Sequence, residues 1–369
     1  MKYISLFTII NLLILAIFLM SHKSTIRSAR FYLSALLLCM AVNMLDYYIL
    51  NNDLYTQYIW EISLGYVTSS FIGPLFYLFV RSMMQQHLKI SVSLWPHLII
   101  PFLVLLNYIS FQWQSSEVKI TYVDSAISNY PIKESLINAI IAFQILGYLL
   151  ASYKSVRRFQ KCLEDNLSYA QNFNLKWLSN FIIFILSFFL ILAASSLYIA
   201  NQDYNAWAGQ ITVTIFYLFI FYKTITYPTI YIDSAEIQKF CVTSKMLDDY
   251  KSDKETDFST IHKTLIHYIE EKKPYLIPKL SLEDLSRELN IKKHTLSQVI
   301  NSQSGQNFFS LINRYRVEEA KNKLTNSQYS NLTIEAIGKE CGFHSASNFF
   351  DVFKKTTGKT PTKYRNHIL

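Results

Sequence analysis

The residues near the C-terminal end that are best suited to bind a ligand are its lysines and arginines. Between Lys279 and Leu369 the chain has 14 Lys and Arg against 8 Asp and Glu, whereas residues 229–278 have 7 against 9. A local basic excess suits contact with a polyanion such as the phosphate backbone of DNA. Each cation alone is typical of a solvated surface, but the set indicates a phosphate-binding face. The candidates are Arg314, Arg316, Lys354, Lys355, Lys359, Lys363 and Arg365.

A second group of ionisable residues lies within apolar segments. Asp46 and Glu61 fall inside two of these segments, and His97 follows Trp95 and Pro96 at the start of another. A carboxylate inside a membrane is costly, so it typically belongs to a ligand cavity or a proton path. Alternatively, both carboxylates lie near the outer ends of their helices and reach water. Asp46, Glu61 and His97 are therefore candidate signal-sensing residues.

No catalytic motif accompanies these residues. The sequence has no phosphate-binding glycine loop, no HExxH motif and no nucleophile elbow, and it contains only 8 Gly among 369 residues. His262 and His267, near Glu270, fall on different helix faces, which argues against a metal site. We predict no catalytic residues, no metal and no cofactor, and a protein that is not an enzyme.

The composition divides the chain into two unlike parts at Pro228. The whole chain is 51% hydrophobic and 15% aromatic, with a mean hydropathy of +0.17. These values are high for an ordinary soluble protein of this size. Only 14 Lys and Arg and 9 Asp and Glu precede Pro228, whereas 21 and 17 follow it. The first part is a membrane candidate and the second is not.

Seven apolar segments precede Pro228, and most approach the roughly 20 residues that a helix needs to cross a bilayer. They cover 3–20, 31–50, 58–80, 94–111, 132–153, 177–200 and 206–222. Basic residues concentrate in alternate connections, and such connections stay cytoplasmic. This pattern predicts seven spans in a bacterial inner (cytoplasmic) membrane, with the N-terminus outside and everything after Tyr222 inside.

Two further expectations follow from this topology. A cleaved signal peptide is the alternative for the first segment, but no small-residue cleavage site follows it. None of the 4 cysteines falls in a predicted external loop, so we expect no disulfide framework.

Residues 229–278 are predicted to form a linker followed by one helix. The linker contains the polar run KSDKETD, and the helix FSTIHKTLIHYIEEKK has apolar residues at helical spacing. These are Phe258, Ile261, Leu265 and Ile269. The apolar face either packs on the next domain or pairs with a second copy of the chain, and packing is the commoner arrangement.

The last ninety residues contain an internal repeat. The first copy is SLEDLSRELNIKKHTLSQVIN and the second, 52 positions on, is TIEAIGKECGFHSASNFFDVF. Each copy has a hydroxyl cap, a small residue, a turn residue that tolerates left-handed backbone, and a second helix with two buried apolar positions. The pairs that match at this spacing are Ser281 and Thr333, Ser286 and Gly338, and Asn290 and Gly342, and the second helix buries Leu296 and Ile300 in the first copy and Phe349 and Phe353 in the second. This order predicts two helix-turn-helix units.

The stretch between the copies makes the pattern more specific. NFFSLINRYRVEEAKNKL, TIEAIGKECGF and FKKTTGKTPTKYR resemble the AraC/XylS family of bacterial transcription regulators. The resemblance covers Leu280 to Arg365, about a quarter of the chain. It implies a domain that places two recognition helices in successive major grooves, with a linker helix holding their separation. Arg314 and Arg316 on that linker are expected to orient the two units.

The resemblance also implies which positions read DNA bases. They are Lys293, His294, Ser297 and Gln298 in the first recognition helix, and His344, Ala346, Ser347 and Asp351 in the second. Gln298 can bridge an adenine edge, and Lys293 can bind a guanine or a phosphate. Asp351 departs from the family, where a basic residue is common, and an acid facing DNA costs affinity unless a cytosine amino group donates to it. We therefore expect the first recognition helix to carry most of the specificity.

Taken together, the sequence predicts an all-α protein with three parts. Residues 1–227 form a seven-transmembrane sensor bundle, 228–278 a cytoplasmic linker and helix, and 279–369 the DNA-binding domain. The protein is predicted to be a membrane-bound one-component regulator that binds promoter DNA and is controlled by an unidentified signal ligand. A homodimer is one of the oligomeric states that this function allows. The alternatives are a transporter or membrane enzyme with an autoregulatory DNA-binding tail, and a tail that only tethers DNA or a partner protein.

Overall fold

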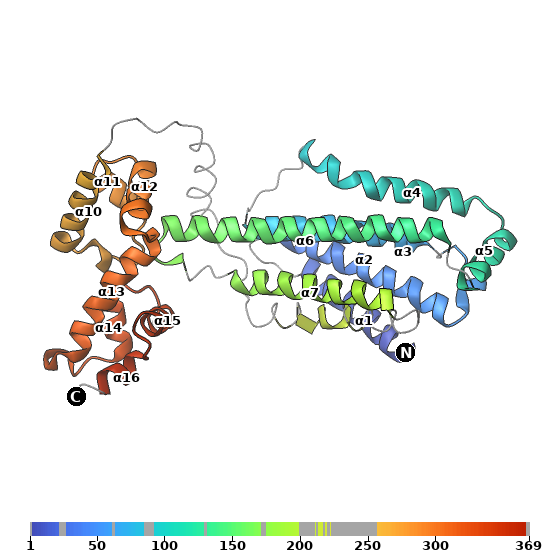
Figure 1. Cartoon of the computed structure of the whole chain (residues 1–369). Coiled ribbons are helices and arrows are strands. Elements are labelled where there is room, and N and C mark those ends of the chain that lie inside the picture. Colours follow the sequence, from blue (N-terminus) through green and yellow to red (C-terminus); the bar gives the residue numbers. More distant parts are fainter. Residues whose placement is uncertain are drawn as a thin grey trace. The chain divides into compact units, whose positions relative to one another are not determined.

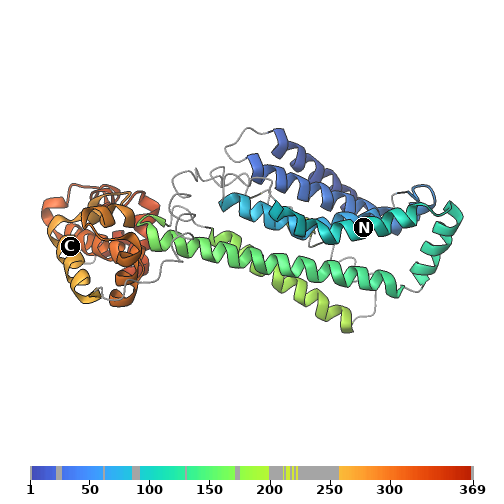
Figure 2. The same cartoon turned by 90° about the horizontal axis from the view of Figure 1, so that it is seen from above.

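The chain is helical throughout its described residues. The computed structural model describes residues 2–21, 27–60, 63–84, 92–128, 131–170, 175–198 and 257–366, with 211, 213–216, 218, 219 and 222. Within these ranges it contains one isolated antiparallel bridge and no strand, which confirms the all-α class. The chain divides into two units, residues 1–156 with 176–234 and residues 157–175 with 235–369. Figures 1 and 2 label the helices of each unit.

Within the described residues, the first unit contains six helices and most of a seventh. They are α1 (Lys2–Ser21), α2 (Arg27–Asn51), α3 (Leu64–Met84), α4 (Ile99–Gln112), α5 (Ser116–Ser128), α6 (Ile132–Asn166), which continues into the second unit, and α7 (Lys176–Tyr198). Helix α2 packs between α1 and α3. One face of α1 is buried through Leu12 and Leu19, whereas Ile14 and Ile17 on the other face are exposed. A helix with apolar side chains on all its faces suits an apolar solvent such as lipid.

Five of these helices are long and apolar enough to cross a membrane by length and composition. They are Tyr3–Ser21, Ser28–Asn51, Leu64–Met84, Trp95–Gln112 and Ile132–Asn166, at the places of the first five predicted spans. The sixth predicted span corresponds to α7, in which Lys176–Phe188 is a shorter apolar helix. The seventh lies mostly outside the described residues. Seven spans and their orientation therefore stay predictions.

Two details of this part differ from the sequence expectations. The connection predicted to be an external loop between Gln112 and Pro131 is largely helical and forms α5. Cys162, on α6, is disulfide-bonded. The expectation of no disulfide was based on the redox compartment, whereas bond formation also depends on how close the fold brings two sulfur atoms. Cys39 and Cys341 are free.

The second unit is an array of short helices around one longer helix. Its helices are α10 (Phe258–Lys272), α11 (Leu282–Glu288), α12 (Lys293–Ser304), α13 (Phe308–Thr325), α14 (Ile334–Glu340), α15 (Ala346–Thr357) and α16 (Pro361–Asn366). Two hydrophobic cores meet along α13. Leu311 and Ile312 belong to the core of the first repeat, and Val317 and Ala320 to the core of the second. Helix α13 therefore joins the two repeats as a shared wall (Figure 1).

The amphipathic helix before the repeats packs within this unit. Asp257 caps α10 by accepting a hydrogen bond from the Ser259 amide. Leu265 and Ile269 are fully buried in the same core as Leu296 of α12. Packing on the next domain, the commoner of the two arrangements considered, is therefore confirmed.

The local features predicted for each repeat are present. Ser281 forms a capping box with Asp284 at the start of α11, and Thr333 caps α14. The turns use left-handed backbone at Asn290, with φ of 52°, and at Gly342, with φ of 84°. Gly338 is needed for close packing, because a Cβ atom there would lie 2.5 Å from Cδ1 of Phe349. Both repeats are helix-turn-helix motifs, as the spacing predicted.

Candidate nucleic-acid interface

The first recognition helix is α12. Its buried face consists of Leu296, Val299 and Ile300, which hold it against the core. His294 is exposed, and Lys293, Ser297 and Gln298 are half-buried, so the four predicted base-reading residues lie off the buried face. Burial lowers the pKa of Lys293, and Glu283 opposes that shift.

The second recognition helix is α15. Ser345 caps it by accepting a hydrogen bond from the Asn348 amide, and Phe349 and Phe353 anchor its buried face. The predicted reading positions His344, Ala346, Ser347 and Asp351 are all exposed. The caps and anchors fix the helix while its first turns stay open to a ligand.

Most of the predicted phosphate contacts are on the surface. Arg314, Lys354, Lys355, Lys359 and Lys363 are exposed. The Arg314 guanidinium lies 5.4 Å from the ring centre of Tyr315. These five cations can approach a phosphate without a rearrangement of the core.

Arg316 is a correction to the sequence prediction, because it is 0% exposed and is therefore not a phosphate contact in this structure. Its Nε donates to the carbonyl oxygen of Tyr275 at 2.7 Å and its Nη2 to that of Ile277 at 2.8 Å. The guanidinium also lies 5.8 Å from the ring centre of Phe343 in the second repeat. Burial lowers the pKa of Arg316 to about 9, so the group is protonated at neutral pH. These contacts with both repeats fit the other role predicted for Arg316, which is to orient the two helix-turn-helix repeats.

Arg365 is also held by the protein. Its Nη1 donates to the carbonyl oxygen of Leu332 at 2.9 Å and its Nη2 to that of Tyr329 at 3.4 Å. The side chain is half-buried. These bonds attach α16 to the loop before α14, so Arg365 acts first as a structural residue.

The sequence reasoning missed a contribution from residues 157–170, which we call the docking segment. It consists of the last ten residues of α6, 157–166, and the first residues of the connection to α7, and it belongs to the second unit. The ring of Tyr169 lies 6.1 Å from the ring of His344, a predicted base-reading residue. The signal in the sequence is weak, since the apolar residues Phe159, Leu163, Leu167 and Tyr169 follow no single helical or strand spacing in a run that is otherwise largely polar.

The candidate signal-sensing residues do not form one cluster. Asp46 is buried on α2 beside Gly65 of α3, where a Cβ atom would lie 2.4 Å from Oδ2 of Asp46. Glu61 lies outside the described residues. His97 Nδ1 is 2.6 Å from the Tyr148 hydroxyl, and its ring lies 5.7 Å from that of Tyr77.

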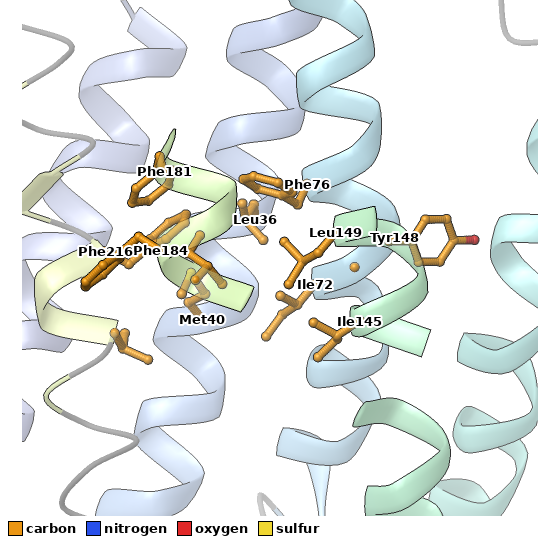
Figure 3. Close-up of a pocket in the computed structure, with 13 residues that line it drawn as sticks. Leu36, Met40, Ile72, Phe76, Ile145, Tyr148, Leu149, Phe181, Phe184 and Phe216 are labelled. Carbon is orange, nitrogen blue, oxygen red and sulfur yellow. The ribbon is translucent and has the colours of Figure 1, made fainter. Parts of the chain in front are cut away.

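The first unit also contains an apolar cavity of about 120 Å³ (Figure 3). Its wall includes Leu36, Met40, Ile72, Gly73, Phe76, Ile145, Tyr148, Leu149, Phe181, Phe184, Ile185, Val213 and Phe216. Figure 3 shows the Tyr148 hydroxyl directed away from the other lining side chains, and this hydroxyl contacts His97. The cavity suits a small apolar molecule, since its wall offers few polar groups. Asp46 does not line it.

Two helix-turn-helix units joined by a shared helix, with open recognition helices and exposed cations, define a DNA-binding domain. Residues 285–367 match the family model described as a helix-turn-helix domain. This segment is an AraC-type helix-turn-helix domain, as the sequence resemblance predicted.

The curated relatives match a limited part of this chain. An uncharacterized HTH-type transcriptional regulator of Staphylococcus aureus (strain COL) is 37% identical over 86 residues, which cover 23% of this chain and 11% of that protein. Regulatory protein PocR of Salmonella typhimurium is 30% identical over 106 residues, covering 29% of this chain and 33% of PocR. The chain thus spans about a tenth to a third of the length of these relatives.

A solved structure of a protein of unknown function from Listeria innocua is 29% identical, with 29% of this chain and 96% of that chain covered. Its TM-score of 0.26 is too low to bear on the fold.

Proposed function

We propose that this chain is a membrane-bound one-component transcription regulator, in which a signal received by the first unit changes how the second unit binds promoter DNA. The observation that carries the proposal is the joining, in one polypeptide, of five helices of membrane-crossing length to an AraC-type domain with open recognition helices. The membrane location, the signal and the promoter target are parts of the proposal.

The proposed division of labour follows from the residues. Lys293, His294, Ser297 and Gln298 of α12 read bases, and exposed lysines near the end of α15 hold the backbone. The apolar cavity is the proposed signal site, with an uncharged small molecule as its ligand. Such a ligand changes DNA binding only if two states of the first unit bind it with different affinity.

DNA selection with the whole chain tests the regulatory function. The full-length protein in lipid nanodiscs is incubated with genomic DNA fragments at 0.15 M salt, an ionic strength that must be fixed because phosphate contacts depend on it. We expect enrichment of a motif with two contacted sets of bases about one helical turn, roughly 10 bp, apart. The matched control is Q298A, which should lose the preference at one half of the motif. Salt-sensitive binding without any motif would contradict sequence-specific regulation and favour a tether.

Reporter fusions test the membrane topology. A cytoplasmic reporter fused after Leu369 should be active, whereas a periplasmic reporter fused at the same place should not. Recovery of the chain in the soluble fraction would contradict the membrane location.

A further inference from the structure

The docking segment is buried against the DNA-binding domain. Leu163 is 1% exposed, Leu167 and Ser168 are 0% exposed, and Tyr169 is 5% exposed. Apolar and polar side chains are both covered, as in the interior of one folded unit. The segment includes the C-terminal turns of α6 and leads toward α7, and both helices otherwise belong to the first unit.

Backbone contacts attach the centre of the segment to the start of the first repeat. Leu167 forms an antiparallel bridge with Ser281, the residue that caps α11. The backbone N–H of Ser168 donates to the carbonyl oxygen of Leu280 at 3.2 Å, and its hydroxyl donates to the same oxygen at 2.8 Å. Such a pattern depends on the path of the main chain, so it fixes the register of the segment.

The linker helix holds the other side of Ser168. The carbonyl oxygen of Ser168 accepts from Asn313 Nδ2 at 3.0 Å and from Arg316 Nη1 at 3.2 Å. The Ser168 hydroxyl oxygen accepts from Arg316 Nη2 at 3.0 Å. A buried guanidinium is costly unless its donors are satisfied. The docking segment therefore completes the hydrogen bonding of the residue that contacts both repeats.

The segment also contacts residues that adjoin the two recognition helices in the chain. Glu164 Oε2 accepts from Asn307 Nδ2 at 3.1 Å, and Asn307 lies between α12 and α13. At the other end Tyr169 packs beside His344, directly before α15. One short segment thus contacts the end of one helix-turn-helix and the beginning of the other recognition helix.

We propose that residues 157–170 are an integral part of the DNA-reading unit, and that docking of this segment sets the relation between the two recognition helices needed for a two-groove site. The surface made by Leu280, Asn307, Asn313, Arg316 and His344 binds this segment of the same chain. The docked form is the DNA-competent form, because all the predicted reading positions lie off the buried faces while the segment is in place.

This inference rests on the proposed function and adds the route of regulation. Signals from the first unit reach the DNA-binding unit through the C-terminal turns of α6 and the residues that follow them. Release of the segment weakens binding to DNA with two half-sites, because that DNA requires a fixed separation between the two recognition helices. Binding to DNA with a single half-site has no such requirement and is unaffected.

A charge at Asn307 tests the proposal in the full-length chain. Asn307 Oδ1 caps α13 by accepting from the Ser310 amide at 2.9 Å, and an aspartate keeps that cap. N307D removes the amide donor to Glu164 and places two carboxylates together. The matched control is N307D with E164Q, in which the Gln amide can donate to the new carboxylate while the added charge at position 307 is retained.

Two measurements are made on the protein in nanodiscs. Hydrogen exchange of residues 163–170 reports docking, since the Ser168 amide is bonded to Leu280. Binding is measured to a duplex with both half-sites of the motif selected by the wild-type chain, and to a duplex with the α12 half-site alone. N307D should increase exchange and weaken the two-half duplex roughly five-fold, without affecting the single half-site. Adding E164Q should restore both.

The outcomes separate the two proposals. No motif selected by the wild-type chain would contradict the proposed function itself. If the wild-type chain selects a motif, unchanged or tighter N307D binding overturns the docking proposal, and so does a double variant as weak as N307D alone. Y169D places an ionised group where the side chain is 5% exposed and undocks the segment independently. If its increased exchange leaves two-half binding unchanged, the proposal is overturned as well.

Discussion

Arg316 and Ser168, 148 positions apart in the chain, share two hydrogen bonds in the interior of the DNA-binding unit. R316M should lower the free energy of unfolding of this unit by about 3 kcal/mol, because three carbonyl groups lose a charged donor in a buried place. Thermal unfolding of the full-length chain measures the loss of stability, and hydrogen exchange in α13 shows whether the loss lies in this unit. The control R314M changes an exposed neighbour and should shift stability by less than about 0.5 kcal/mol. Equal effects of the two variants would refute the assignment.

Gly338 sets how closely α14 and α15 approach. G338A should destabilise the second repeat by about 2 to 3 kcal/mol, since the new Cβ would lie 2.5 Å from Phe349 Cδ1. Ser286 has the equivalent position in the first repeat, where its hydroxyl donates to the carbonyl oxygen of Ile291 at 2.6 Å. S286A should cost only about 1 kcal/mol. The melting temperature of the DNA-binding unit, measured for G338A and for S286A, tests both values. A G338A variant as stable as the wild type would contradict the close packing of α14 on α15.

Asp351 is exposed on the second recognition helix, where its charge faces the proposed DNA. D351N should strengthen DNA binding roughly five-fold by removing repulsion from phosphates. The control E335Q removes an exposed acid from the first turn of α14. Titration with the selected duplex provides the comparison. Weaker binding of D351N only to sites with one particular cytosine would instead show that Asp351 accepts from that base.

Lys354 and Lys355 are exposed in the last turn of α15. The double variant K354Q/K355Q should reduce the salt dependence of DNA binding, with the slope of log K against log salt falling by about 0.9 for each lost phosphate contact. Sequence preference should not change, because phosphate contacts carry none. K339Q on α14 is the control. An unchanged slope in the double variant would exclude both lysines from the interface.

Asp46 and Gly65 form a close contact between α2 and α3. G65A should lower the melting temperature of the first unit, since its Cβ would lie 2.4 Å from Asp46 Oδ2. Combining G65A with D46A removes the clashing carboxylate and should recover most of the loss, a coupling expected of residues in contact. G147A on α6 is the control, because a Cβ there meets nothing within 4 Å. Failure of D46A to rescue G65A would contradict this contact.

The helix-turn-helix units were predictable because their determinants are local. A capping serine or threonine, a residue that tolerates left-handed backbone and a small residue recur at fixed spacing, and each acts within a few positions. Asn290 illustrates this, since its φ of 52° follows from the turn between α11 and α12. Apolar runs likewise predicted the long helices of the first unit, because a run of about 20 apolar residues is itself a local signal of a long helix.

Arg316 and the docking segment were not predictable in this way. An arginine on an amphipathic helix is usually exposed, and its burial depends on carbonyl groups supplied by Tyr275, Ile277 and Ser168. The residues around Leu167 have no distinctive period, because their contacts are made with segments more than 100 positions later. Long-range pairing of main-chain groups leaves little trace in a single sequence.

The assembly of the second unit from two separate stretches also determines the order in which it is built. During synthesis Ser168 leaves the ribosome 148 residues before Arg316, a delay of roughly 7 to 30 s at the usual rates of translation. Over that interval Leu163, Leu167 and Tyr169 have no partner from the domain. Helix α7 is made within it, so both the helix that contains the start of the docking segment and the helix that follows the segment are complete when the domain emerges. The rest of the second unit therefore completes its folding against the docking segment, which was synthesised earlier.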